Sequence, residues 1–493
     1  MLLFISFGSS IHGDPTLLIE DYDPLVDTTV TFELLSIRSL EKDDNHLHTR
    51  EYIDRYTGPD FFVKVWINDE MKKSQIWRNT RYVYDPNFSF EVDVPDEEEM
   101  VDIKIQLWDW NIGLNRLCDI SYDNTFTSDA KDIELTYSIK YGLWWGDDFT
   151  SDDMIGNDPS GYGRLNGCDD GSIYQHDFDC ELWFNIYQND YDNDGIPYWV
   201  ETNIYGTDPT LNNAMDDPDE DGVPFLWEYI YGHYCWENWR TEQIEHEWIY
   251  DPLNWDDHKS IDVDDDGLSN YEEYLTWQWG SDPFRKDLFV EMDVMEDGPN
   301  GEKIAFPPES KELLQTVYNR KNIVYHLDDG CMGGGEIIPF DTLCSYNELQ
   351  FIYDRYFLHM NQDNWRKGVF HYGLVVNEAE GAYGFVFRRD AYQISAVGMD
   401  KKARLPHLDK AIVYASAYMH ECGHTLGIYH GNTPGCDDQE GKFPWQIDWW
   451  KWRPYKSVMN YGYMYWMLDY SDGSRGQNDF DDWNRLDLTY FQG

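Results

Sequence analysis

The chain has 493 residues and a formal net charge of −57, from 94 acidic and 37 basic residues. A surface this negative repels phosphate backbones, so we exclude nucleic acid as a partner. Hydrophobic residues make up 41% of the chain, which is enough for packed cores. The sequence has no apolar run of about 18 residues, so we expect no membrane-spanning helix.

The N-terminal segment 1–13 (MLLFISFGSSIHG) is apolar at first and then rich in small residues. It resembles the end of a signal peptide, although it lacks a basic start, and a first β-strand would have the same pattern. We favour the signal, which predicts a secreted or cell-surface protein. The eight cysteines are an even set that suits such a compartment, and Cys168–Cys180, Cys331–Cys344 and Cys422–Cys436 are candidate disulfides.

Residues 14–185 are predicted to form an all-β sandwich. Hydrophobic and polar residues alternate along 61–67 and along 101–108, which is the period-two pattern of half-buried strands. Turn-forming residues such as Asp85-Pro86-Asn87 separate these runs. Short alternating strands between turns are typical of a β-sandwich.

Three strings in this region, GPDFFVKVWIN, YDPNFSFEVDV and VDIKIQLWDWN, resemble the C2 domain. In that family, loop aspartates chelate calcium, and the resemblance gives this role to Asp60 and Asp109. A plain sandwich with surface aspartates is the alternative. The domain is also a candidate module for association with a cell surface or a glycan.

Residues 186–285 contain three copies of a twelve-residue pattern, at 190–201, 217–228 and 262–273. Acidic side chains occupy positions 1, 3 and 5, Gly position 6, an aliphatic residue position 7 and Glu position 12. This spacing predicts calcium loops, in which three carboxylates, one backbone carbonyl and a bidentate Glu converge. The predicted ligands are Asp190, Asp192, Asp194, Ile196 and Glu201; Asp217, Asp219, Asp221, Val223 and Glu228; and Asp262, Asp264, Asp266, Leu268 and Glu273.

The loops depart from paired EF-hands at position 8. Pro197 and Pro224 stand there in the first two copies, and proline lacks the N–H that pairing of two loops requires. The copies resemble the solitary DxDxDG repeats of thrombospondin type 3. That resemblance implies that calcium stiffens a connector between domains.

From 286 to 493 the pattern becomes mixed α/β. Strands are predicted at 288–294, 322–327 and 369–376, and helices at 309–318 and 408–427. Alternating strands and helices, ending in a helix that carries histidines, predict a catalytic domain.

The segment HECGHTLGIYH begins at His420. On a helix, His420 and His424 share one face and can bind one metal. Gly427 can end the helix and turn the chain, so that His430 returns as a third ligand. Three protein ligands leave a fourth position open on Zn²⁺, and Glu421 beside the first ligand is the predicted general base.

This string matches the HExxHxxGxxH motif and resembles the metzincin superfamily of zinc peptidases. Ser457-Val458-Met459-Asn460-Tyr461 is similar to the Met-turn of that family. The resemblance implies that Met459 lies beneath the metal and that Tyr461 stabilises the oxyanion; a packing role for Tyr461 is the alternative. It also implies that substrate pairs with an edge strand, for which 369–376 is our candidate.

The sequence therefore predicts a multidomain chain with a C2-like sandwich, a calcium-loop linker and an α/β metzincin domain. The predicted function is a secreted zinc metalloendopeptidase that hydrolyses protein or peptide substrates. The alternative is a calcium-dependent adhesion or scaffold protein with a vestigial peptidase domain. An intact Glu421 favours the enzyme.

Overall fold

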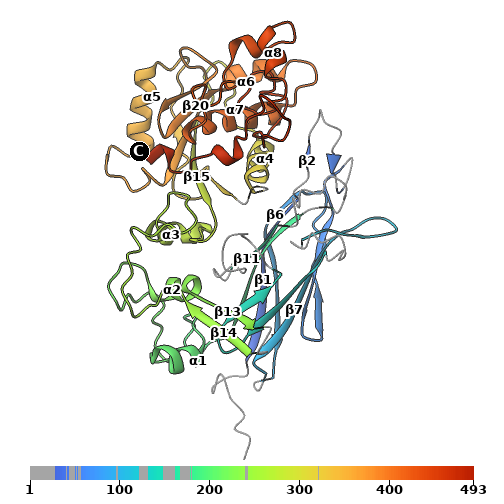
Figure 1. The fold of residues 1–493 in the computed structure, drawn as a ribbon, viewed down its shortest axis with the longest axis vertical. Coiled ribbons are helices and arrows are strands. Elements are labelled where there is room, and N and C mark those ends of the chain that lie inside the picture. The colour runs from blue at the N-terminus through green and yellow to red at the C-terminus, as the bar shows by residue number, and fades with distance from the viewer. Residues whose placement is uncertain are drawn as a thin grey trace, which may run out of the picture.

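The computed structural model describes residues 28–39, 42–43, 50–51, 53, 57–95, 98–120, 131–147, 162–166, 178, 180–238, 243–319, 321 and 323–492. The predicted signal segment lies outside them. The chain forms an N-terminal β-sandwich, a connector of loops and short helices, and a C-terminal α/β unit (Figure 1). No helix among the described segments combines the length and the hydropathy needed to cross a bilayer.

Two antiparallel sheets form the sandwich. One has the strand order β11-β12-β1-β6, and the other has the order β10-β9-β7-β4-β5 with β8 beside β7. Side chains alternate between buried and solvent-facing along β7, as its sequence predicts. The strands are β1 (Thr29–Ser39), β4 (Phe61–Ile67), β5 (Glu70–Lys73), β6 (Tyr82–Asp93), β7 (Met100–Asp109), β8 (Arg116–Leu117), β9 (Ile133–Ser138), β10 (Leu143–Gly146), β11 (Tyr162–Asn166) and β12 (Cys180–Gln188), and β2 (Lys42–Asp43) pairs with β3 (Arg50–Glu51) apart from both sheets.

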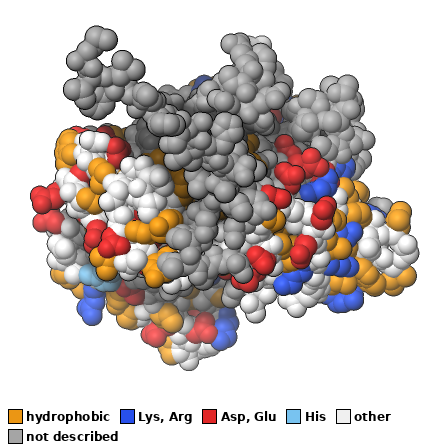
Figure 2. All heavy atoms as spheres, turned by 90° about the horizontal axis from the view of Figure 1, so that it is seen from below, with side chains coloured by type: hydrophobic (Ala, Val, Ile, Leu, Met, Phe, Trp, Pro, Cys, Tyr) orange, Lys and Arg blue, Asp and Glu red, His pale blue; other side chains and the backbone are white. Residues whose placement is uncertain are grey.

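The connector follows β12, and a short helix comes after each acidic loop. Between the second and third loops it also carries the antiparallel hairpin β13–β14. Seen from below, carboxylates are spread over the described surface rather than gathered in one patch (Figure 2). The elements of the connector are α1 (Tyr198–Val200), η1 (Glu201–Tyr205), α2 (Phe225–Gly232), β13 (His233–Asn238), β14 (Gln243–Trp248), α3 (Asn270–Thr276) and η2 (Trp277–Trp279).

The α/β unit is built on a sheet of order β16-β15-β18-β20-β19, with β17 also paired to β15. All pairs are parallel except β19 with β20, which is antiparallel. The strands are β15 (Asp287–Met295), β16 (Val324–Asp328), β17 (Ile337–Ile338), β18 (Phe370–Val376), β19 (Gly384–Arg388) and β20 (Ala391–Ser395). The helices are α4 (Pro308–Asn319), α5 (Tyr346–Ile352), η3 (Tyr353–Phe357), α6 (Ala396–Ala403), α7 (Lys410–Thr425), η4 (Gln439–Gly441), α8 (Ile447–Lys451), η5 (Trp483–Arg485) and η6 (Tyr490–Gln492).

The prediction that 369–376 is the substrate-pairing edge strand was wrong. Strand β18 lies between β15 and β20, and every one of its residues is buried. Both of its neighbours occupy its backbone hydrogen-bonding groups. The edge strand on this side of the sheet is β19, which has one partner only.

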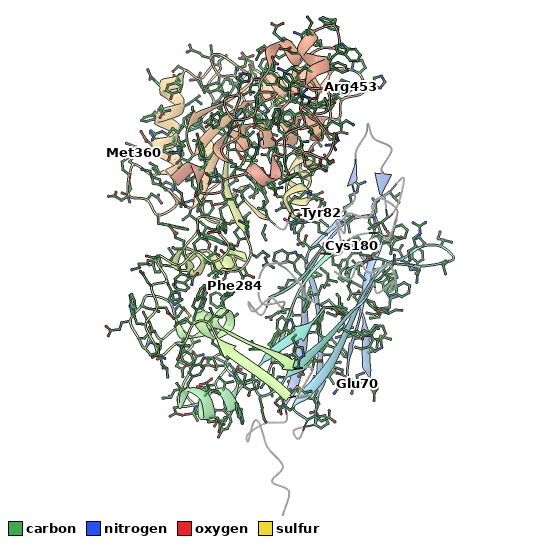
Figure 3. All side chains as sticks on the ribbon, in the orientation of Figure 1. Glu70, Tyr82, Cys180, Phe284, Met360 and Arg453 are labelled. Carbon is green, nitrogen blue, oxygen red and sulfur yellow. The ribbon has the colours of Figure 1, made fainter. Side chains whose placement is uncertain are left out.

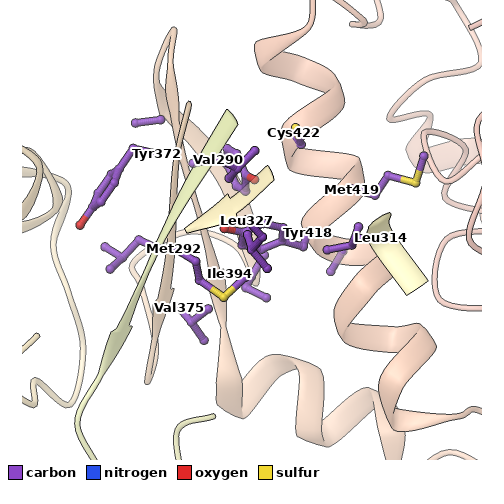
Figure 4. Packing of buried hydrophobic residues seen from close by; sticks show 14 of the residues in the cluster. Val290, Met292, Leu314, Leu327, Tyr372, Val375, Ile394, Tyr418, Met419 and Cys422 are labelled. Carbon is purple, nitrogen blue, oxygen red and sulfur yellow. The ribbon is translucent and has the colours of Figure 1, made fainter. Parts of the chain in front are cut away.

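Helix α7 packs across the sheet and forms the core of this unit. Tyr418 and Cys422 project from α7 toward strand residues such as Val290 and Ile394 (Figure 4). A glycine in the middle of β18, Gly373, lets the helix approach, because a Cβ there would overlap the Tyr418 hydroxyl. The histidine motif is therefore held on a rigid, buried helix.

Helix α4 connects the α/β unit to the sandwich. The Tyr82 hydroxyl of β6 donates to the Glu312 carbonyl at 3.0 Å, and Tyr82 lies just below α4 (Figure 3). Asn319, the last residue of α4, donates to both carboxylate oxygens of buried Glu181, at 2.9 and 2.8 Å. The sandwich is thus anchored by specific polar contacts to the same helix that packs on α7.

Four cysteines of the α/β unit, Cys331, Cys344, Cys422 and Cys436, have free thiols. Of the three pairings suggested by the sequence, Cys331–Cys344 and Cys422–Cys436 are not formed, and Cys168 lies outside the described residues. Burial raises the pKa of Cys422 to about 11, so this thiol stays protonated and acts as a small apolar group.

We predict that Gly373→Ala destabilises the α/β unit by about 1–3 kcal/mol, the usual cost of overpacking a core. Denaturant unfolding followed by fluorescence measures this change. Tyr418→Phe removes the hydroxyl that the new methyl group would meet, so the double variant should recover part of the loss. Equal stability of Gly373→Ala and wild type would contradict the close approach.

Candidate metal centres

Helix α7 places the first half of the histidine motif. The Asp409 side chain caps it by accepting from the N–H groups of Ala411 and Ile412. After the helix ends at Thr425, Gly427 adopts a left-handed φ of 86°, which a residue with a Cβ rarely adopts. The chain therefore turns where the sequence predicts, and His430 follows the turn.

All three histidines share one hydrogen-bonding pattern. In each ring Nδ1 donates to a backbone carbonyl, so the Nε2 of the neutral ring carries a lone pair. The acceptors for His420, His424 and His430 are the carbonyls of Val458, Ile428 and Cys436, at 2.8, 2.6 and 3.0 Å. Metal-ligating histidines are held by carbonyls in this way, and none of these contacts is visible in the motif spacing.

A carboxylate that the sequence reasoning missed lies against these rings. Asp437 Oδ1 is 3.1 Å from His420 Nε2, and Oδ2 is 3.3 Å from His424 Nε2. The Asp437 backbone is in the left-handed region at φ 57°, and its N–H donates to the Met459 carbonyl at 3.2 Å. An acidic residue seven positions after His430 is too weak a signal to single out in so acidic a chain.

The two histidines and Asp437 shift one another's pKa values. Burial lowers the pKa of His420, but its hydrogen bond to Asp437 and the charges of Glu421 and Asp437 outweigh burial and raise that pKa to about 9. Burial and the His420 charge lower the pKa of His424 to about 4. The pKa of Asp437 falls well below its usual range: burial opposes this change, but its contacts with the two histidines outweigh burial. Without a metal, a proton lies between the histidine Nε2 atoms and the Asp437 carboxylate. A divalent metal could take the place of this proton.

Glu421 is 4% exposed, and its carboxylate lies against Gly384 at the start of β19, where a Cβ would collide with it. Burial raises the pKa of Glu421 to about 7, although His420 opposes the shift. A carboxyl group that titrates near neutrality, beside a metal position and an edge strand, has the properties of a general base.

Met459 and Tyr461, the two Met-turn candidates, both contact helix α7. Met459 is fully buried, and its sulfur faces Gly423 of α7. The Tyr461 ring stacks on His420 with 5.6 Å between centroids. Burial, and then the charge of hydrogen-bonded Asp437, raise the pKa of Tyr461, so its hydroxyl remains a proton donor.

The three acidic loops of the connector adopt one common conformation. The residue at position 4 and the Gly at position 6 have positive φ in every loop, for example Asn193 at 60° and Gly195 at 88°. In every loop the first aspartate accepts from the N–H groups of positions 5 and 6, and the third accepts from that of position 7. The side chains at position 7, Ile196, Val223 and Leu268, are buried.

The interior of each loop holds carboxylate oxygens without a hydrogen-bond partner. These buried oxygens belong to Asp192, Asp219, Glu228, Asp264 and Glu273. Burial and neighbouring carboxylates raise the pKa of Asp192 and of Asp219 to about 6 and that of Glu228 to about 10. Buried, unpaired and mutually repelling oxygens fit a calcium ion.

Each loop also receives a residue from outside the twelve-residue pattern. The backbone N–H groups of Asn213, Asp256 and Asp287 donate to the third aspartate of the first, second and third loop, respectively. The Asn213 side-chain oxygen is buried without a partner. Sequence spacing cannot find these residues, because the intervals between loop and added residue differ from copy to copy.

The second loop contains a histidine that the sequence reasoning also missed. Buried His258 places Nε2 3.1 Å from Asp221 and 3.4 Å from Glu228. In the other two loops, hydroxyls contact the position-12 glutamate, Thr207 on Glu201 and Ser281 on Glu273. His258 therefore takes the place of a hydroxyl in holding this glutamate.

Protein groups bind the carboxylates of the C2-like pair Asp60 and Asp109, and their calcium role stays a prediction. The two carboxylates lie together, since the Asp60 N–H donates to Asp109 at 2.9 Å. However, Arg78 and the Asn79 N–H occupy the oxygens of Asp60, and Asn111 donates to Asp109. Every carboxylate oxygen already has a protein partner, and the Arg78 guanidinium supplies the positive charge.

Comparison with known proteins identifies the sandwich. A family model described as C2 domain matches residues 28–121, so the N-terminal domain is a C2 domain over this range. The match ends before the connector and the histidine centre. No curated protein matches the chain.

Similar solved structures include human GIVD cytosolic phospholipase A2, with 11% identity, TM-score 0.19, and coverage of 33% of this chain and 17% of that one. The tandem C2 domains of Extended-Synaptotagmin 2 match with 9% identity, TM-score 0.20, and coverage of 38% and 47%. A C2 domain protein from Ramazzottius varieornatus matches with 10% identity, TM-score 0.19, and coverage of 32% and 88%. The chain thus spans less than half of the first two structures.

We predict that calcium stabilises the protein and that the effect shrinks as pH falls from 8 to 5. The loop carboxylates have raised pKa values in the folded state, so the calcium-free folded protein takes up protons in this range and gains stability. At calcium near 100 times the dissociation constant, each site adds about 2.7 kcal/mol. Thermal unfolding with calcium or with EGTA at several pH values measures the difference.

Asp264→Asn should reduce the calcium-induced rise in Tm, because Asp264 has a buried oxygen aimed into its loop. Asp265→Asn is the matched control. Asp265 stands at position 4 with φ 57°, a conformation that Asn tolerates. Equal calcium responses of the two variants would contradict the assigned site.

Proposed function

We propose that the chain is an exported zinc metalloendopeptidase whose calcium loops stiffen the connector. The observation that carries the proposal is the hydrogen-bonding pattern that His420, His424 and His430 share, each with Nδ1 donating to a carbonyl. Asp437 adds a carboxylate beside the first two rings. Three imidazoles are donors that zinc prefers, and they leave its fourth position open for water, with the Asp437 charge as a neighbour.

A zinc ion held by these residues would polarise the scissile carbonyl and lower the pKa of a bound water. Glu421 accepts the proton of the attacking water and passes it to the leaving amine. Its pKa of about 7 suits both steps at neutral pH. Tyr461, which stays protonated beside His420, donates a hydrogen bond to the oxygen that becomes negative.

The edge strand β19 is the surface proposed to align the substrate. It pairs with β20 on one side, and on the other side its Phe387 carbonyl accepts from Tyr346 and Gln350. The backbone nearer Gly384 is the part proposed to pair with an extended peptide. Gly384 at its start lies against Glu421. A peptide paired with β19 would therefore pass next to the general base.

The second candidate is a calcium-dependent adhesion or scaffold protein with an inactive peptidase domain. The C2 domain and the calcium-type loops favour it, since both are common in binding proteins. The buried Glu421, with its pKa near neutrality, favours the enzyme. The C2 domain is then a candidate for attachment to a cell surface or a glycan.

We expect Glu421→Gln to lower kcat/KM for peptide cleavage by about 10²–10⁴-fold, the usual contribution of a general base. Zinc content should stay near that of wild type, because Glu421 is not proposed to bind the metal. Elemental analysis and a peptide-library digest measure the two quantities. Full activity of the variant, or a wild-type protein that binds no zinc, would refute the proposal.

Asp437→Asn should weaken zinc binding by at least about tenfold, as expected when a charged neighbour of the metal is neutralised. Asp438→Asn is the matched control, because the Asp438 carboxylate faces Trp452 instead of the histidines. Competition with a chromophoric chelator gives the dissociation constants. Identical constants for the two variants would show that Asp437 does not act on the metal.

A further inference from the structure

Three lysines surround the candidate active site. Lys442 Nζ lies over the Tyr461 ring at 4.6 Å, and Lys402 Nζ over the Tyr465 ring at 4.8 Å. Lys401 Nζ donates to the Tyr383 hydroxyl at 3.1 Å. The chain therefore places three ammonium groups on aromatic side chains within one small region.

Two of these aromatic residues adjoin the histidine centre and strand β19. Tyr461 stacks on His420, and Tyr383 immediately precedes Gly384, the first residue of β19. Burial raises the pKa of Tyr465, and the nearby charge of Glu421 adds to this shift. The lysines thus lie around the general base and at the start of the strand that is proposed to align the substrate.

Within the part of the chain that the structure describes, none of the three lysines forms an ion pair with a carboxylate. Nearby Lys410 does form one, with Asp400 at 2.9 Å. Burial together with the charges of Lys442 and Lys401 lowers the pKa of Lys402. Lys401 and Lys442 therefore repel the charge of Lys402, and no ion pair offsets this repulsion in the described part of the chain.

Local sequence composition points the same way. The segments 401–410 and 442–456 each contain four lysines or arginines or more and a single acidic residue. In a chain with 94 acidic and 37 basic residues, such a local excess is unusual. The two segments flank the histidine motif in sequence, and α6 and α8 lie at the same end of the α/β unit (Figure 1).

We propose that these three lysines select acidic peptide segments. Asp or Glu side chains of the substrate bind Lys401, Lys402 and Lys442, while the substrate main chain pairs with β19. The inference rests on the proposed peptidase function and names its substrate class. Charge complementarity fixes both specificity and encounter rate, because the rest of this acidic chain repels the same peptides.

The test uses the full-length, zinc-loaded protein and three fluorogenic peptides of equal length. They differ only in the residues that flank the scissile bond, which are Glu, Gln or Lys. We expect kcat/KM for the Glu peptide to exceed that for the Gln peptide by about tenfold, since each exposed ion pair contributes a few-fold. The ratio should fall as salt is raised from about 0.05 to 0.5 M, because salt screens exposed charges.

The double variant Lys402→Glu/Lys442→Glu should lose the preference for Glu and favour the Lys peptide, while it still binds zinc. Lys303→Glu is the matched control, because Lys303 is an exposed lysine whose charge is paired with Asp297. Should the double variant fail to bind zinc, Lys402→Gln and Lys442→Gln test the loss of preference separately. An unchanged Glu-to-Gln ratio in these variants overturns the inference and leaves the peptidase proposal intact.

Binding is measured independently of cleavage by anisotropy of labelled Glu and Gln peptides on the zinc-loaded Glu421→Gln protein. Tighter binding of the Glu peptide, reversed by the double substitution, supports the inference. If wild-type protein binds zinc but cleaves none of the peptides and binds both labelled peptides equally, the proposed function and the inference both fail. Cleavage of the Gln and Glu peptides at equal rates refutes the inference alone.

Discussion

In two parts of the structure, buried groups that would repel one another without a cation lie close together. In the connector, carboxylates of the same loop lie close together with buried oxygens that lack partners. In the α/β unit, the Asp437 carboxylate faces the ring nitrogens of His420 and His424. Burial makes each arrangement costly without a positive charge and tight with one. In the C2 sandwich, the Arg78 guanidinium supplies the positive charge beside the Asp60 carboxylate.

The rest of the fold keeps these centres rigid. Helix α7 is buried along nearly its whole length, and Gly373 lets it lie close to the sheet. Helix α4 packs on α7 from one side and holds the C2 domain through Tyr82 and Asn319 on the other. A partner that moves the C2 domain would therefore act on a helix that contacts the helix of the histidine motif.

Much of this could be predicted, because it is encoded in local spacing. The four-residue interval of His420 and His424 puts both rings on one face of a helix, and Gly427 turns the chain after it. The frame of the acidic loops likewise brings their carboxylates together within one short loop. Two features could not be predicted in this way. Strand β18 is as hydrophobic as its sequence suggests, but a buried run does not tell a central strand from an edge strand. Asp437, Asn213 and His258 reach their sites through long-range packing, and in a chain with 94 acidic residues a single aspartate carries no signal.

The third acidic loop is joined directly to the start of the sheet in the α/β unit. Asp266 accepts from the N–H of Asp287 at 2.6 Å, and Asp287 is the first residue of β15. Without an ion in the loop, repulsion from Asp287 adds to that among the loop carboxylates. For the proposed exported peptidase, the connector would thereby work as a maturation checkpoint. A chain made where calcium is scarce would have a weakened first strand, and would complete its fold after it reaches a calcium-rich medium, where cleavage can no longer damage the cell that made it.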